Sequence, residues 1–498
     1  MSISFNNIPS TIKVPGAYVE FDNTQAMSGA TLMEYTALIV GHKLSTGTAE
    51  NLAEYPVTSV KQAKALFGPG SQAAVMAEAF IKNNSFTRLK VIGVDVEDDA
   101  VKAEGRLTFG GTCSGAGSVC LYVGGHVVKC PCHVTTTAVV LATNMAAAIN
   151  ADADCVVTAT ASSQTVGEEV QGIVTLSAKT AGLTGNAIDL RLGYYGETLP
   201  SGITAAVTAM AGGSGAPDVD NIIAALGDNW YHIIAWPWTD RASLLALEAE
   251  LEDRWGPLRH IDGVAVCSVS GTFSAVQDFG SGVTAGNYAH ISIVEDCLSP
   301  DLPCARAAAV AGVAAYYGNI DPARPFQTLT LKGCLAPATN QRLTLQEQNL
   351  LISAGIATTM VDASGNVAVQ RLVTNYLTNA SGATDTSYQD VNTLLTLSFL
   401  RYDFRARILR KYPRHKLAGD SENIAPGQAV MTPKQGRAEA ISAFLDWQEL
   451  GLVENLDAFK SYLVCERNAT DVNRLDWLIQ PDLVNQFRIA AVQIQFKL

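Results

Sequence analysis

Charged residues are scarce in this sequence, and long apolar runs are absent. Asp, Glu, Lys and Arg make up 16% of the 498 residues, whereas ordinary globular domains contain roughly 25%. A surface with few charges is typical of a protein that buries much of itself in an assembly, although a composition rich in Ala, Thr and Gly looks the same. No segment approaches the ~20 apolar residues of a membrane span, and the most apolar helical segment, residues 305–317, contains Arg306. We therefore expect no membrane insertion.

The charge balance and the first residues argue against two further classes of protein. The formal net charge is −13, and general nucleic-acid binding is not expected, because phosphate contacts need clustered cations. Residues 1–6 have neither the basic start nor the apolar core of a secretory signal. We expect a protein that is made in the cytoplasm.

The motifs of common enzyme classes are also missing. The sequence contains no Gly-x-Ser-x-Gly elbow and no Gly-x4-Gly-Lys-Ser/Thr phosphate loop. Residues 111–115 form a cysteine version of the elbow, but they lie in β-like sequence and not at a strand-to-helix turn. Residues 68–73 only echo a dinucleotide loop, because Pro69 is unfavourable there. His232 and His290 fall on predicted buried strands, where a core histidine is the commoner role. We expect no catalytic residue and no cofactor.

Ten cysteines in a chain of this length do not form a disulfide framework. Cys130-Pro131-Cys132-His133 is the one cluster that hints at a metal site. Its spacing is tighter than the usual Cys-x-x-Cys of zinc sites, and no second pair lies at a standard distance. We favour reduced, buried thiols in a β-rich domain and expect no metal, with a metal site as the open alternative.

Length and local patterns predict an α/β protein of about three domains with an extended arm at each end. Strands expected at residues 230–236, 263–269 and 289–294 alternate with helices, which predicts a doubly wound parallel sheet. A Thr-, Val-, Ala- and Gly-rich segment with short β-like runs interrupts this pattern, and Asp390 and Thr432 mark the starts of two later helices. The predicted parts are an N-terminal arm (1–30), an α/β core (31–104 and 213–339), an inserted, mainly β domain (105–212), an α+β C-terminal domain (340–486) and a C-terminal strand arm (487–498).

The two arms are the first candidate functional feature. Apolar and polar residues alternate at the C-terminus, so that a strand there would have one apolar face. Such a strand must pair with a sheet, either in its own domain or in a neighbouring subunit. Because the N-terminal arm also has too little apolar surface to fold alone, we favour donation to neighbouring subunits, with backbone hydrogen bonds and side-chain pockets setting the register. The candidate residues are Val14, Gly16, Tyr18, Val19, Phe21, Ile489, Val492, Ile494, Phe496 and Leu498.

A basic helix is the second candidate feature. The helix expected over residues 391–412 is stopped by Pro413, and pairs at spacing i,i+4 should form two cationic ridges along it. The alternatives are a solvated face, internal pairing with acidic residues of the same domain, or contact with an acidic partner. The candidate residues are Arg401, Arg405, Arg407, Arg410, Lys411 and Arg414.

Several short motifs, taken in their order along the chain, resemble a known family. Residues 14–20 contain a Pro-Gly-x-Tyr segment, and turn motifs follow at 56–68, 322–325 and 333–337. The segment 355–416 then combines two apolar-polar stretches around Asp-Ala-Ser-Gly-Asn with a polar spacer and the basic helix. This order is similar to that of contractile-tail sheath proteins, particularly those of Mu-like bacteriophages, over residues 10–100 and 215–498.

The resemblance implies a structural subunit and no enzymatic activity. Sheath proteins polymerise as helical rings around a tail tube and contract to drive the tube through the host envelope, and their arms augment a sheet in the C-terminal domains of neighbours. The resemblance also implies partners, namely copies of the same chain, the tube protein, and baseplate and tail terminator proteins. The basic helix would contact an acidic surface of the tube or of an adjacent sheath subunit, and we favour the tube. Expected locations are the virion and, during assembly, the host cytoplasm. The core would be of the kind compared with subtilisin, and the insertion would project outward. The alternatives are the sheath of a tailocin or similar injection device, and an oligomeric α/β enzyme without a recognisable active site.

Overall fold

The computed structural model describes residues 33–282, 285–422, 425 and 427–497. The described chain divides into two compact units. We call residues 34–398 together with 486–497 the core unit, and residues 399–485 the C-terminal unit. The chain thus leaves the core unit after Ser398 and returns to it at Gln486.

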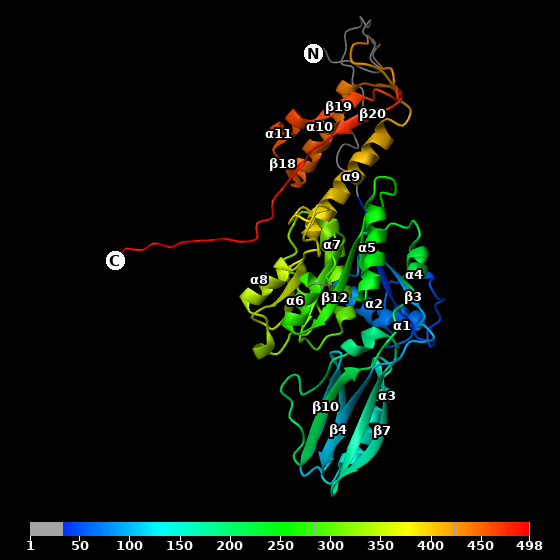
Figure 1. Ribbon diagram of the computed structural model, residues 1–498, viewed down its shortest axis with the longest axis vertical. Coiled ribbons are helices and arrows are strands. Elements are labelled where there is room, and N and C mark those ends of the chain that lie inside the picture. Colours follow the sequence, from blue (N-terminus) through cyan, green and yellow to red (C-terminus); the bar gives the residue numbers. More distant parts are fainter. Residues whose placement is uncertain (1–32, 283–284, 423–424, 426, 498) are drawn as a thin grey trace, which may run out of the picture. The chain divides into compact units, whose positions relative to one another are not determined.

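An eight-stranded mixed sheet forms the centre of the core unit within the described residues, in the order β15-β14-β13-β12-β11-β1-β3-β2 (Figure 1). The strands from β3 to β14 run parallel, while β2 and β15 pair antiparallel at the two edges. The strand order reverses between β1 and β11, as in a doubly wound sheet. The bounds are β1 Thr36–His42, β2 Glu54–Pro56, β3 Arg88–Val94, β11 Ile233–Ala235, β12 Val264–Gly271, β13 Ile291–Cys297, β14 Ile356–Val361 and β15 Val367–Arg371.

The central strands of this sheet are buried on both faces, and helices pack against them. β13, for example, is buried at every position, which is typical of a parallel strand between two helical layers. Helices α4, α5, α6 and α8 share one hydrophobic core with the sheet, whereas α2 and α7 pack against each other and α7 against β12. The mixed α/β class expected from the sequence is therefore confirmed. The bounds are α1 Val60–Phe67, α2 Gln72–Asn83, α4 Val219–Leu226, α5 Arg241–Trp255, α6 Phe273–Ser281, α7 Pro303–Ile320 and α8 Leu345–Ser353, with a short 3-10 turn at Thr339–Gln341.

The hairpin β14–β15 belongs to the core sheet, whereas the domain boundary expected at residue 340 would place this hairpin in the C-terminal domain. Ile356 and Ala357 of β14 pair in parallel with Ile293 and Val294 of β13. The division between the compact units accordingly falls at Ser398. The turn around Asp362 shows in sequence that a hairpin forms, but it carries no information about which distant strand the hairpin joins.

Residues 104–211 build two antiparallel sheets and one helix around a second hydrophobic core, which includes Leu107, Phe109 and Leu141 and is completed by Leu302 before α7. The sheet orders are β10-β4-β8-β7 and β6-β5-β9 (Figure 1). Helix α3 packs on β7 and β8. The bounds are β4 Glu104–Gly111, β5 Gly117–Val123, β6 His126–Cys132, α3 Ala138–Ala151, β7 Val157–Val166, β8 Glu169–Ala178, β9 Leu190–Leu192 and β10 Ile203–Ala211, with a 3-10 turn at Leu183–Ala187.

The described part of the C-terminal unit contains helices and three short strand pairs around a small aromatic core. Phe444 stacks on Phe459 at 4.3 Å between ring centroids, and Thr432 forms a capping box with Gln435 at the start of α10. Helix α9 begins in the core unit and continues into this one. No described helix is both long and apolar enough to cross a bilayer. The bounds are α9 Val391–Lys411, α10 Pro433–Glu449, α11 Leu456–Tyr462, β16 Lys416–Leu417 with β17 Val430–Met431, β18 Val453–Glu454 with β21 Asp482–Leu483, and β19 Val464–Arg467 with β20 Leu475–Leu478.

Candidate functional site

The C-terminal arm carries a row of apolar side chains that its own fold leaves uncovered. Residues 487–497 belong to no helix or strand, and Figure 1 shows them as an extended red segment. The exposed fractions are 77% for Phe487, 84% for Ile489, 79% for Val492, 83% for Ile494 and 80% for Phe496. Exposed apolar side chains in an extended backbone are what strand addition to another sheet requires. Leu498 and the N-terminal candidates Val14, Gly16, Tyr18, Val19 and Phe21 lie outside the described residues.

The root of this arm is attached to the core unit by polar contacts that the sequence did not indicate. Arg488 Nη2 lies 2.9 Å from Asp390 Oδ1. The amide of Gln486 donates a hydrogen bond to Ala323 O at 3.2 Å, and that of Gln327 donates one to Phe487 O at 3.4 Å. These partners are separated by roughly a hundred residues or more, and neither periodicity nor spacing connects groups so far apart.

Part of the predicted basic ridge is internal to the C-terminal unit. Arg407 is 1% exposed, and its guanidinium lies 2.6 Å from carboxylate oxygens of both Asp403 and Asp446. The indole of Trp447 donates a further hydrogen bond to Asp403 at 2.7 Å. Arg407 therefore cannot face a partner, because the buried carboxylate of Asp403 and the partly exposed carboxylate of Asp446 hold it between α9 and α10.

Lys411 also has an internal partner, since its ammonium lies 2.8 Å from Glu439 Oε1. The hydroxyl of Tyr412 donates to the other oxygen of Glu439 at 2.7 Å. For Arg407 and Lys411, the structure thus favours the internal pairing that the sequence left open. Arg401 is half-buried, whereas Arg405, Arg410 and Arg414 are exposed, as is Lys411 despite its ion pair.

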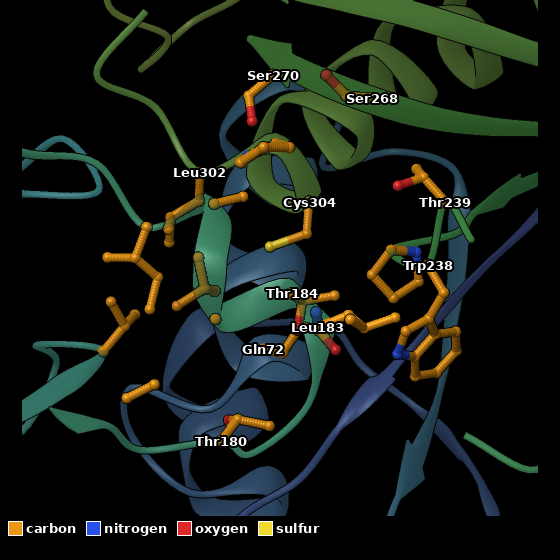
Figure 2. A pocket seen from close by; sticks show the side chains of 18 of the residues that line it. Gln72, Thr180, Leu183, Thr184, Trp238, Thr239, Ser268, Ser270, Leu302 and Cys304 are labelled. Carbon is orange, nitrogen blue, oxygen red and sulfur yellow. The ribbon is translucent and has the colours of Figure 1, made fainter. Parts of the chain in front are cut away.

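A cavity of about 310 Å³ lies in the core unit beside the carboxyl ends of β11 and β12 (Figure 2). Helices α2, α5 and α7 begin at its wall, and residues of the inserted segment, such as Leu183 and Thr184, close it. Ligands of open α/β sheets often bind at this edge. The polar groups on its wall include Gln72, Thr239 and Ser270.

The cavity holds a thiol but no base beside it. Cys304 lies at the start of α7, and burial raises the pKa of its thiol to about 12. The carboxylate of Asp240 already accepts hydrogen bonds from the amide and hydroxyl of Ser243 as the cap of α5. No histidine, lysine or arginine is among the described residues that line the cavity. Nucleophilic catalysis needs a thiolate or a neighbouring base, and this wall supplies neither.

His232 and His290 directly precede β11 and β13 instead of lying on them, and both are packing residues. His232 stacks on Tyr35 with 4.5 Å between ring centroids, and burial lowers its pKa to about 4. His290 contacts Glu248 Oε1 through Nδ1 at 3.0 Å. Both side chains are enclosed in the core unit rather than directed into the cavity.

The cysteine-rich segment does not bring its candidate ligands together. Cys130 and Cys132 are each 1% exposed, whereas His133 is exposed. All ten cysteines are free thiols, eight of them buried, and burial raises the pKa of Cys132 to about 11. Among the described residues, no group of three or more His, Cys, Asp or Glu side chains could hold a metal ion.

Comparison with known proteins gives consistent matches along the chain. Residues 212–375 match the family described as the phage tail sheath protein central domain, and residues 383–497 match the phage tail sheath C-terminal domain. The Mu-like prophage FluMu tail sheath protein of Haemophilus influenzae is 41% identical over 497 residues, which cover 100% of both chains.

Solved sheath structures are similar at lower identity. The sheath tail protein of Desulfitobacterium hafniense is 14% identical, with a TM-score of 0.47 over 94% of this chain and 100% of that one. The sheath complex of an extracellular contractile injection system, PVC, in its contracted state is 11% identical, with a TM-score of 0.47 over 98% of each chain. Identity of 41% over the whole of both chains, together with the two family matches, establishes the relationship. The chain belongs to the phage tail sheath protein family.

Proposed function

We propose that this protein is the subunit of a contractile tail sheath, which polymerises as helical rings around a tail tube and contracts to drive the tube through a host envelope. The C-terminal arm is the observation that carries this proposal. Its apolar side chains, from Ile489 to Phe496, are about four-fifths exposed, and a second copy of the chain that offers a free sheet edge would cover them. The same mode of pairing is proposed for the N-terminal residues Val14–Phe21.

The proposed energy source is mechanical rather than chemical. An extended lattice and a shorter, wider one would differ in buried area and in electrostatic contacts between subunits, and a trigger at the baseplate would release the first into the second. Strands exchanged between neighbours would keep the lattice connected while the subunits rotate. No nucleotide is needed in such a mechanism.

Further partners are proposed from charge and from family membership. The exposed cations Arg405, Arg410 and Arg414 would contact an acidic surface of the tail tube, and added salt should weaken that contact. Baseplate and tail terminator proteins would bind the two ends of the sheath. The protein would occur in the virion, after assembly in the host cytoplasm.

Negative-stain electron microscopy of the purified protein tests this proposal. We expect long hollow tubes at high protein concentration, because each subunit both donates and accepts strands. A protein that stays a monomer, or that forms small closed rings, would contradict the proposal.

A further inference from the structure

Asp390 is a carboxylate shared by two arginines of the core unit. Its Oδ1 lies 3.1 Å from Arg371 Nε and 2.9 Å from Arg488 Nη2, and its Oδ2 accepts a hydrogen bond from Arg371 Nη2 at 3.2 Å. The side chains are 16%, 27% and 25% exposed for Asp390, Arg371 and Arg488 respectively. One negative charge therefore holds two guanidinium groups in a partly desolvated site.

The backbone around Asp390 is itself fixed. Asp390 forms a bridge with Val373, and the amide of Val391 donates to Leu372 O at 3.4 Å. Asp390 also directly precedes α9, where the positive end of the helix favours a negative charge. The carboxylate thus has a defined position relative to β15 and to the sheet.

The polar contacts described above between the arm and the core unit end at this ion pair. Gln486 and Phe487 are tied to the core unit through Ala323 and Gln327, and Arg488 is tied through Asp390. From Ile489 onward the apolar side chains are about four-fifths exposed. The anchor and the free segment therefore meet between residues 488 and 489.

We propose that Asp390 is a positioning residue that fixes the root of the C-terminal arm to the core unit. The chain reaches the arm directly from the C-terminal unit, but this ion pair makes the arm extend from the core unit. This inference rests on the proposed function of the arm as a donated strand. A strand of residues 489–497 would reach about 30 Å. Among the described residues, the nearest backbone hydrogen bond upstream of the root is donated by the amide of Val484 to Leu452 O at 3.1 Å. Release of the root would therefore free several more residues and reduce the effective concentration of the strand at its acceptor.

The first test measures access to the root in unassembled full-length protein. Chymotrypsin should cleave after Phe487, and mass spectrometry should follow release of peptide 488–498. In Asp390→Asn the two arginines lose their shared anion and repel each other, so we expect cleavage roughly tenfold faster, since cleavage follows the population of the open root. Arg488→Met should give a similar increase, and the double variant should add little to either single change.

Two control variants distinguish loss of the ion pair between Asp390 and Arg488 from a general loosening of the surrounding loop. Asp385→Asn lies in the same loop, but its carboxylate bonds to Tyr376 and Ser387 instead of the arm; its cleavage rate should match that of the natural protein. Arg371→Met removes the competing guanidinium and should not accelerate cleavage. Natural rates in Asp390→Asn would overturn the proposed anchor, whether or not the arm is a donated strand.

The second test measures tube order in the same variants. Asp390→Asn tubes should be shorter and should give weaker layer lines in electron-microscope diffraction than those of Asp385→Asn. Faster cleavage combined with normal tubes would show that the ion pair holds the root without positioning the strand, and would overturn the inference. Tubes that form normally without residues 487–498 would instead refute strand donation itself.

Discussion

Asp296 is fully enclosed in the core unit beside a second and a third carboxylate. It lies 2.9 Å from Arg306 Nε, and the same guanidinium also pairs with Asp301 at 2.9 Å. Glu295 accepts a hydrogen bond from the amide of Thr359 at 3.1 Å. One arginine cannot neutralise three buried acids, and burial raises the pKa of Asp296 to about 7. Asp296 therefore retains its proton in the folded protein at pH values where an exposed aspartic acid has lost it.

A pH-dependent stability follows from this pKa. Between about pH 4 and pH 7 the unfolded chain releases the proton of Asp296 and the folded chain keeps it, so stability falls as pH rises, by at most about 1.4 kcal/mol per pH unit. Asp296→Asn imitates the protonated acid and should flatten this dependence, with a gain in stability over the natural protein that grows from pH 5 to pH 8. Urea unfolding of unassembled protein measures it. Asp457→Asn, at an exposed position, is the matched control, and parallel profiles for Asp296→Asn and the natural protein would contradict the argument.

Single residues were predicted from sequence where their role depends on neighbours in the chain. Thr432 caps α10 and Asp390 directly precedes α9, as the local patterns indicate. Arg306 instead looked like an interruption of an apolar helix, and its partners Asp296 and Asp301 could not be inferred, because ion pairs have no sequence periodicity outside a helix.

For helix α9, too, the sequence predicts what neighbouring residues determine but not the contacts with residues distant in the chain. Its predicted range, 391–412, is within one residue of the observed Val391–Lys411, because the end is set locally by Pro413. Which of its cations are exposed depends on where Asp446 and Glu439 of α10 lie. The spacing i,i+4 correctly places Arg407 and Lys411 on one side of the helix, and that side packs against α10.

Substitutions on the two sides of α9 should therefore have different effects. Arg407→Met removes a buried cation that pairs with the enclosed carboxylate of Asp403, and should lower the free energy of unfolding by about 3–5 kcal/mol. Arg405→Glu with Arg410→Glu alters exposed side chains and should leave unfolding nearly unchanged. Urea unfolding of both variants makes the comparison.

The exposed pair has a second expected effect, on assembly. Arg405→Glu with Arg410→Glu should slow growth of sheath on purified tail tubes at low salt, because the acidic partner would be repelled. Arg405→Gln with Arg410→Gln, which removes charge without reversing it, should fall between the double-Glu variant and the natural protein. Equal growth rates for all three would remove the proposed tube contact.

At the scale of the whole molecule, the sequence predicted the mixed α/β class that the structure has, because strand-like and helix-like patterns alternate along the chain. It misplaced the hairpin 356–371, which joins β13, since parallel pairing over such a separation depends on the finished sheet. The core unit combines residues that precede the C-terminal unit in sequence with the arm that follows it. Deletion of the arm tests whether subunits are connected through it.

Deletion of residues 487–498 should leave a folded subunit that does not polymerise. The arm contributes exposed apolar side chains rather than core packing, so its loss should lower the melting temperature little, by about 2–4 °C at most for each kcal/mol of root contacts removed. Size-exclusion chromatography with light scattering measures the assembly state. Tubes of normal length from the deletion variant would refute strand donation, and an unfolded variant would show that the arm belongs to the core.

The return of the chain to the core unit at Gln486 also affects how the subunit is made. Asp390 leaves the ribosome roughly a hundred residues before Arg488 follows, which corresponds to about 5–20 s of synthesis. During that interval, Arg371 is present to pair with the carboxylate of Asp390, but Arg488 is not yet synthesised. A nascent subunit thus has no anchored donor strand, and pairing with other copies through this arm waits until translation has passed the end of the C-terminal unit.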